Sequence, residues 1–99
     1  MKIPVSQASY DLLVPRLLVV TDLVAIEHVG VHLEPTVALE ELPPGRHFMA
    51  EIRRPDGSRA RAPAYATVTR ANPTRAYVAL NRLTAADVPI GTEVWTVDK

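Results

Sequence analysis

The sequence predicts a mainly β protein, a small single-domain antiparallel β-barrel with one or two short helical turns. Residues 47–54 alternate apolar and polar side chains with the period of two that a half-buried strand requires. Residues 59–96 give, in order, a strand, an Asn-Pro corner, a strand, one helical turn and a last strand. A length of 99 residues suits one domain with a modest core. We therefore expect one barrel domain over residues 1–99.

The first half of the chain supplies a short turn and several strands. Residues 6–13 predict one helical turn, which Pro15 must end. Residues 16–21 and 24–33 are rich in β-branched and aliphatic side chains and predict two strands. In the second strand, Val29 and Leu33 share one face and His28 and His32 the other. Residues 36–42 alternate weakly, and Pro43-Pro44-Gly45 predicts the turn that stops them.

The centre of the chain predicts a hairpin of two strands. Over residues 47–54, Phe48, Ala50 and Ile52 point inward. Arg54-Pro55-Asp56-Gly57 then predicts a tight turn, because proline presets one angle and glycine accepts the left-handed geometry. Small side chains share one face of the outgoing strand and leave room for larger inward side chains such as Leu80. These residues are Ala60, Ala62, Ala64, Ala66 and Val68.

The last third completes the sheet. Asn72-Pro73 predicts a corner, and residues 75–81 predict the strand after it. Thr84 and Asp87 have the spacing of a capping box, which predicts one helical turn. Residues 92–97 supply the last strand, with Trp95 as the only indole of the chain.

Charge is balanced overall but segregated along the chain. The first 51 residues carry three cations against seven anions, whereas residues 52–82 carry seven arginines against Asp56 alone. The formal net charge of zero argues against a general polyanion binder. This uneven distribution of charge predicts pairing within the molecule or association with a charged partner. Arginine suits the recognition of carboxylates and phosphates. The arginine bias has an alternative origin in genomic base composition.

No catalytic, cofactor or metal motif is present. The absence of cysteine excludes disulfides, thiolate catalysis and cysteine-ligated zinc. Scattered glycines exclude a phosphate-cradling loop, and no serine lies in a strained nucleophile elbow. The beginning of the chain lacks a secretory signal, and charges and Pro15 interrupt its apolar stretch. We expect a cytoplasmic protein with no membrane association, no cofactor and no catalytic activity of its own.

Histidines are the only candidates for a metal site, and the pattern disfavours them. His28 and His32, four positions apart on one strand, would lie about 13 Å apart and would not share an ion. His32 and Glu34 would share a metal only if His47 joined them from a neighbouring strand. Solvated surface histidines are the favoured interpretation, and no metal ligand is assigned.

The basic hairpin is the candidate binding site. Arg53 and Arg54 enter it, and Arg59 and Arg61 leave it on the face opposite the alanines. These four guanidinium groups predict a site for an anionic ligand or partner, with salt-dependent association. The alternative is a solvated hairpin paired internally with an acidic side chain, the candidates being Glu40, Glu41 and Glu51.

Several segments together resemble the carboxy-terminal β-barrel domain of the aminomethyltransferase family, which includes the glycine cleavage T-protein. They are Pro43-Pro44-Gly45-Arg46-His47, Val68-Thr69, Asn72-Pro73-Thr74, Val78-Ala79-Leu80 and Gly91-Thr92-Glu93-Val94. The Ser-Gly that follows Val-Thr in that family is missing here, as is the folate-binding catalytic domain. The resemblance implies a barrel fold and no transferable activity. Translation-factor barrels share the short helical turn and the glycine before the last strand.

The sequence therefore favours a non-catalytic binding domain, an accessory subunit or protein-interaction module. A protein partner or a homo-oligomer is expected, because the apolar run of residues 17–33 leaves a sheet edge or face to cover. Two alternatives stay open. One is a detached barrel subunit of a folate-dependent methyltransferase-like enzyme, and the other is a nucleic-acid-binding barrel that uses the hairpin of residues 53–61. Nucleic acid is not favoured, since only Tyr65 and Tyr77 offer stacking surfaces near the arginines.

Overall fold

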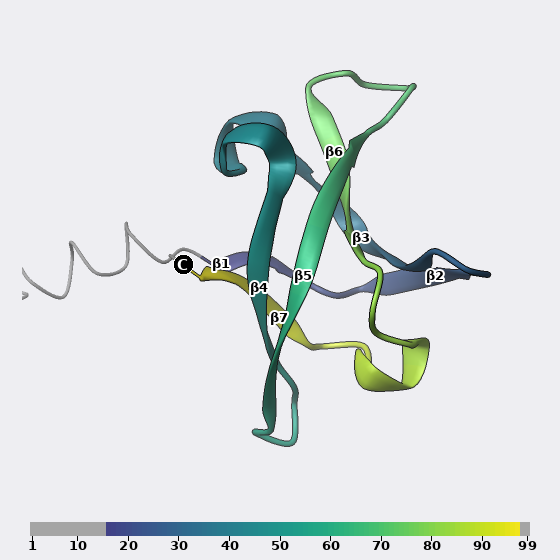
Figure 1. The fold of residues 1–99 in the computed structure, drawn as a ribbon, viewed down its shortest axis with the longest axis vertical. Helices are drawn as coiled ribbons and strands as arrows, with labels where there is room; N and C mark the ends of the chain where they lie inside the picture. Colours follow the sequence, from purple (N-terminus) through teal and green to yellow (C-terminus); the bar gives the residue numbers. More distant parts are fainter. Residues whose placement is uncertain (1–15, 98–99) are drawn as a thin grey trace, which may run out of the picture.

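The computed structural model describes residues 16–97 and shows a β-rich fold (Figure 1). Its strands are β1 (Arg16–Val19), β2 (Asp22–Ile26), β3 (Gly30–Ala38), β4 (His47–Arg53), β5 (Arg59–Val68), β6 (Arg75–Leu80) and β7 (Glu93–Val97). Three short 3-10 helices connect them, η1 (Leu39–Glu41), η2 (Pro44–Arg46) and η3 (Ala85–Asp87). The predicted turn at residues 6–13 lies outside the described residues.

All seven strands belong to one antiparallel sheet. Their spatial order is β1-β7-β4-β5-β6-β3-β2, so the long β4–β5 hairpin occupies the middle and the first two strands occupy the ends. The sheet twists and curls into a half-barrel (Figure 1). The prediction of a mainly β antiparallel fold with short helical turns is confirmed.

The corner between β1 and β2 connects the two ends of the sheet. The amide of Val20 donates to the carbonyl of Thr92, just before β7, at 2.8 Å. The amide of Thr21 donates to the carbonyl of Glu34 in β3, at 2.9 Å. Consecutive residues thus bond to opposite ends of the sheet, and this holds the sheet in its curled shape.

The concave side of the sheet encloses an aliphatic core. Every second side chain of each strand points to this side, because successive side chains of a strand point to opposite faces. Leu33, Ile52 and Leu80 are its largest fully buried side chains. Ala62 and Ala64 of β5 are also buried, which confirms the predicted small-residue face beside a large inward Leu80. Ala50 and Ile52 are buried as predicted, with Phe48 packed against the same core.

The predicted single strand over residues 24–33 is wrong. β2 ends at Ile26, a turn follows, and β3 begins at Gly30 and pairs back on β2. The amide of Val29 donates to the carbonyl of Ile26 at 2.9 Å, which closes the turn. Gly30 has a φ of 123°, an angle that L side chains rarely adopt. His28 and Val29 lie in the turn and leave the predicted pattern, whereas the faces hold for the flanking strands, where Ala25 pairs with Val31 and Val24 with His32.

Residues 36–42 divide between two elements. β3 continues to Ala38 after an irregularity in its pairing with β6, and η1 follows. Arg75 of β6 holds this end of β3, because its Nε donates to the Thr36 hydroxyl at 2.8 Å. The predicted turn at Pro43-Pro44-Gly45 is confirmed, with Gly45 at a φ of 81°.

The turns predicted later in the chain are confirmed. The amide of Gly57 donates to the carbonyl of Arg54 at 2.9 Å in the β4–β5 turn. At the β5–β6 corner, the Asn72 side chain accepts the amide of Thr74 at 3.1 Å. The amide of Thr84 donates to the Asp87 carboxylate at 2.8 Å and begins η3 as the capping-box spacing predicts.

We predict that Gly30→Ala strongly destabilises the fold. A Cβ at this position would collide with the backbone of Leu80 and Asn81, and the φ of 123° adds strain. Together these effects should lower the free energy of unfolding by about 2–4 kcal/mol, measured by urea unfolding. Gly57→Ala is the matched control, because it has a similar φ but open space, and it should cost about 1 kcal/mol. Equal losses in the two variants would show that the close approach at Gly30 carries no cost.

Candidate functional site

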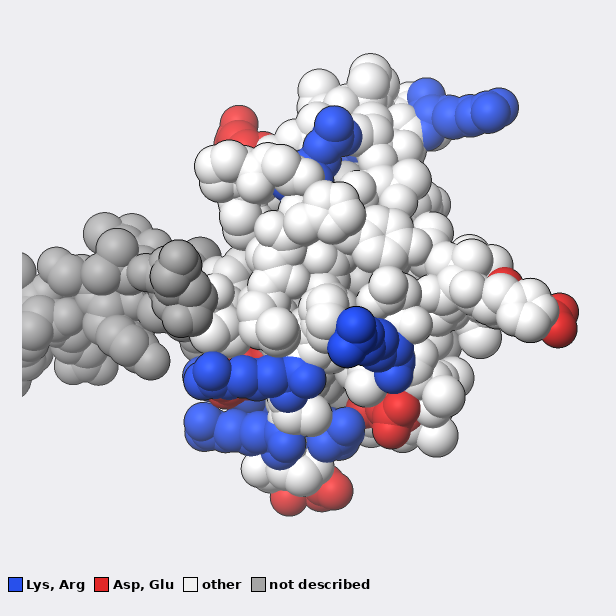
Figure 2. All heavy atoms as spheres, viewed as in Figure 1, with Lys and Arg blue, Asp and Glu red and all other residues white. Residues whose placement is uncertain are grey.

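The β4–β5 hairpin distributes the four predicted arginines between two faces. Arg53 pairs in register with Arg59, and Glu51 pairs with Arg61. Glu51 and Arg53 occupy alternate positions of β4, and Arg59 and Arg61 occupy the positions of β5 that pair with them. The side chains of these four residues therefore share the outer face of the sheet. We call Glu51, Arg53, Arg59 and Arg61 the arginine cluster. Figure 2 shows basic side chains gathered over the lower part of β4 and β5, beside a largely uncharged surface above them.

Glu51 is the centre of the arginine cluster. Its carboxylate accepts a hydrogen bond from Arg53 Nε at 2.7 Å. Arg59 Nη1 lies 3.5 Å from Glu51 Oε2, and Arg61 Nε lies 3.5 Å from Glu51 Oε1. The Glu51 side chain is only 12% exposed, whereas those of Arg59 and Arg61 are 64% and 63% exposed. The expected internal pairing therefore forms through Glu51; no ion pair of the described residues joins the hairpin to Glu40 or Glu41.

The arginines also set the charge state of Glu51. The hydrogen bond from Arg53, reinforced by the charges of Arg53, Arg59 and Arg61, lowers the pKa of Glu51, and partial burial opposes this only in part. Glu51 is thus an anion at neutral pH. Three guanidinium groups around one carboxylate leave an excess of positive charge on the outer face.

Trp95 extends the arginine cluster across β7. The Arg53 guanidinium lies over the indole ring, 4.1 Å from its centroid, which is a cation–π contact. The indole Nε1 donates to Glu93 at 2.9 Å, and Glu93 lies 3.4 Å from Arg16 of β1. Arg53 is therefore fixed by Trp95 on one side and Glu51 on the other. Sequence reasoning noted Trp95 without a role, because only the β4–β7 pairing brings it beside Glu51.

Arg54 does not belong to the arginine cluster, which corrects the prediction of a four-arginine site. Its Nε donates to the carbonyl of Asp87 at 2.6 Å, and its Nη1 reaches the Ser58 hydroxyl at 3.3 Å. Arg54 therefore connects the hairpin to η3. The physical reason is strand alternation, which turns consecutive residues to opposite faces.

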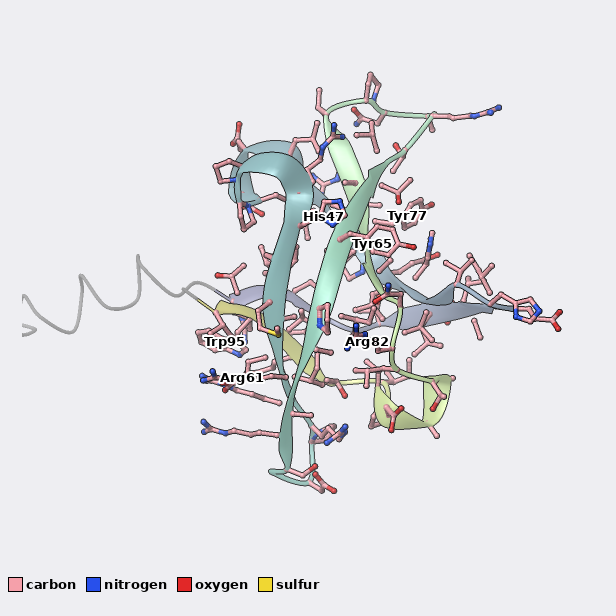
Figure 3. All side chains as sticks on the ribbon, in the orientation of Figure 1. His47, Arg61, Tyr65, Tyr77, Arg82 and Trp95 are labelled. Atoms are coloured by element: carbon pink, nitrogen blue, oxygen red, sulfur yellow. The ribbon has the colours of Figure 1, made fainter. Side chains whose placement is uncertain are left out.

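A second group of side chains, the aromatic surface, lies on the outer face beyond the arginine cluster. It consists of His32, His47, Tyr65 and Tyr77. The rings of His47 and Tyr65 are stacked with centroids 6.1 Å apart, and those of His32 and Tyr77 are tilted at the same separation. Figure 3 shows Tyr65 and Tyr77 close to His47, with Arg61 and Trp95 lower on the sheet. Sequence reasoning missed the histidines here, because their rings meet the tyrosines only through strand pairing.

Open hollows border the aromatic surface. One, of about 410 Å³, is lined by His47 and Tyr65 together with His28, Val29 and Asn81. A second hollow, of about 450 Å³, is also lined by His28, Val29 and Asn81, and in addition by Arg82 and other residues of the β2–β3 turn region. A smaller one, of about 150 Å³, lies beside Tyr77 and contains Glu34, His32 and the exposed Val24 and Ile26.

The described residues do not assemble a metal site. Over residues 16–97, no three side chains of His, Asp or Glu gather in a geometry that would hold an ion. His28 pairs with Glu27 at the turn, at 3.5 Å, and His32 and His47 each contact a tyrosine ring. Within the same residues, no helix has the length and apolar character needed to span a bilayer.

Comparison of the chain with known protein families, with curated proteins and with solved structures found no match. The resemblance to the aminomethyltransferase barrel therefore stays a prediction.

We predict that Glu51→Gln destabilises the protein at neutral pH. The pKa of Glu51 is lowered from 4.5 in the folded state, so its contribution is present above pH 4.5 and is lost as the pH falls through the folded value. The variant should lose about 1–2 kcal/mol of unfolding free energy at pH 7. Urea unfolding of both proteins should show this difference shrinking towards about pH 3.

The control for this prediction is Glu40→Gln, which removes an exposed carboxylate outside the arginine cluster. It should change stability by less than about 0.5 kcal/mol at either pH. A Glu51→Gln protein as stable as the Glu40→Gln protein at pH 7 would contradict a central role for Glu51.

Proposed function

We propose that this chain is a non-catalytic binding domain that recognises anionic groups of a larger partner through the arginine cluster. The observation that carries the proposal is the convergence of Arg53, Arg59 and Arg61 on the single carboxylate of Glu51. Like charges gathered at one place repel one another unless counterions neutralise them. One internal carboxylate neutralises one of the three charges, and a bound anion would neutralise the others.

The Arg53 guanidinium is oriented before any partner arrives, and Arg59 and Arg61 lie beside it. Each guanidinium has five N–H donors, of which Glu51 engages only a few. Arg53 is held by Glu51 and Trp95, while Arg59 and Arg61 project from the same face with most of their surface exposed. A planar fork of donors matches a carboxylate or a phosphate. Orientation before binding reduces the entropy lost on association.

The lowered pKa values of three acidic side chains fit structural roles for these groups and not general acid–base catalysis by them. Hydrogen bonds lower the pKa of Glu51, of Asp56 and of Asp87, with donors on Arg53, Ser58 and Thr84 respectively. General acid–base catalysis at neutral pH works best with groups whose pKa lies near 7, so a carboxyl used this way has a raised value. These three carboxylates instead hold turns and arginines in place.

We predict that Arg59→Gln/Arg61→Gln weakens binding to an immobilised polyanion. On a heparin column the variant should elute at a clearly lower salt concentration than the natural chain, because two exposed phosphate- or sulfate-binding groups are lost. Arg46→Gln/Arg70→Gln is the matched control, since it removes the same charge from two exposed positions outside the arginine cluster. Equal shifts in both double variants would show that net charge alone governs retention and would defeat the proposed site.

A further inference from the structure

We infer that the ligand of the outer face is a single-stranded nucleic acid, with phosphates bound by the arginine cluster and bases stacked on the aromatic surface. The inference rests on the proposed function and names its ligand. Proteins that bind single strands combine arginine-lined paths for the backbone with aromatic side chains on which successive bases stack. This outer face presents both features on neighbouring positions of the same strands.

The rings lie on adjacent strands around one small residue. Tyr65 of β5 and His32 of β3 both pair in register with Ala79 of β6. Tyr77 lies two residues before Ala79 on the same face of β6, and His47 stacks on Tyr65 from β4. Ala79 is fully buried although it faces outward. The rings therefore crowd over a flat floor, and their outer surfaces are left for a planar ligand.

The distance between the two groups requires a long ligand. Arg61 and Tyr65 are four residues apart on the same face of β5, which corresponds to about 13 Å along the strand. A small anion would occupy the arginine cluster alone. A chain of several nucleotides would reach both groups, with its backbone on Arg59 and Arg61 and its bases over Tyr65.

Arg82 adds positive charge below the aromatic surface. The hollow beside Tyr65 and His47 shares Asn81 with the hollow that Arg82 lines. Figure 3 shows Arg82 below Tyr65, towards the level of Arg61, as expected from the pairing of Tyr65 with Ala79 in the antiparallel β5–β6 ladder. Glu34 lies beside Tyr77 and Glu27 beside His28, so negative charge marks the border towards β2. Arg61 and Arg82 therefore both border the aromatic surface from below, and the favoured path for a polyanion leads from these arginines to Tyr65.

Stacking distinguishes a nucleic acid from an acidic protein. A peptide of Asp and Glu would pair with the arginines, but it would offer no aromatic rings to stack on Tyr65, Tyr77 and His47. Bases have a π face whatever their sequence, so a surface of this kind binds with little sequence preference. The arrangement of the rings thus favours the nucleic acid.

The test is fluorescence anisotropy with a labelled mixed-sequence single-stranded oligonucleotide of about 12 nucleotides, in RNA and DNA forms. The natural chain should bind either form, with affinity falling as salt rises. Tyr65→Ala should weaken binding about tenfold, because a stacking ring is lost. Tyr65→Phe keeps the ring and should stay within about twofold. Thr67→Ala is the control, a nearby exposed position on the same face of β5.

A heparin column run in parallel separates failure of the inference from failure of the proposed function. Heparin has anionic groups but no bases, so Tyr65→Ala should leave its retention unchanged. Arg-dependent heparin retention without oligonucleotide binding would overturn the inference and leave the proposed function standing. If neither arginine-dependent heparin retention nor oligonucleotide binding were observed, the inference and the proposed function would both be overturned. Poly-glutamate binding as tight as that of the oligonucleotide, with no effect of Tyr65→Ala on either, would assign the face to an acidic protein and overturn the inference.

Discussion

The corner at Val20 and Thr21 is the constraint on which the rest of the structure depends. Two consecutive amides bond to opposite ends of one sheet, Val20 to Thr92 before β7 and Thr21 to Glu34 in β3. The amide of Gly91 donates a hydrogen bond to the carbonyl of Val20. The Val20 side chain is buried, with 1% of its surface exposed. A flat sheet would not satisfy these bonds together. The curl that they impose encloses the aliphatic core on one side and leaves the other side as a continuous outer face.

The outer face depends on the same alternation that builds the core. On β4, Ile52 points into the core while its neighbours Glu51 and Arg53 point out. The pairing of β4 with β5 and β7 then places Arg61 and Trp95 on either side of Glu51. A carboxylate surrounded in this way is well shielded from water and keeps its charge. Glu51 thereby organises a positively charged surface.

The two binding elements that we infer share a strand and differ in chemistry. β5 carries Arg59 and Arg61 near the hairpin and Tyr65 further along the same face. Its inward residues include Ala62 and Ala64, which add little bulk to the core, whereas its largest side chains, Arg59, Arg61 and Tyr65, belong to the outer face. A strand of this composition contributes more to the surface than to the hydrophobic interior. That division is why we assign function to the outer face.

The sequence by itself determined the β class, the turns at Gly45 and Gly57, and the separation of Arg61 from the alanines, because alternation and turn chemistry are local properties. It also offered internal pairing of the basic hairpin as one of two interpretations, with Glu40, Glu41 and Glu51 as candidate partners. Only the tertiary structure decided that Glu51 is the partner, that Arg54 bonds to η3, and that residues 24–33 fold back at Gly30. These outcomes depend on which strands become neighbours, and neighbours far apart in the chain are chosen by burial of the whole core and not by any single segment.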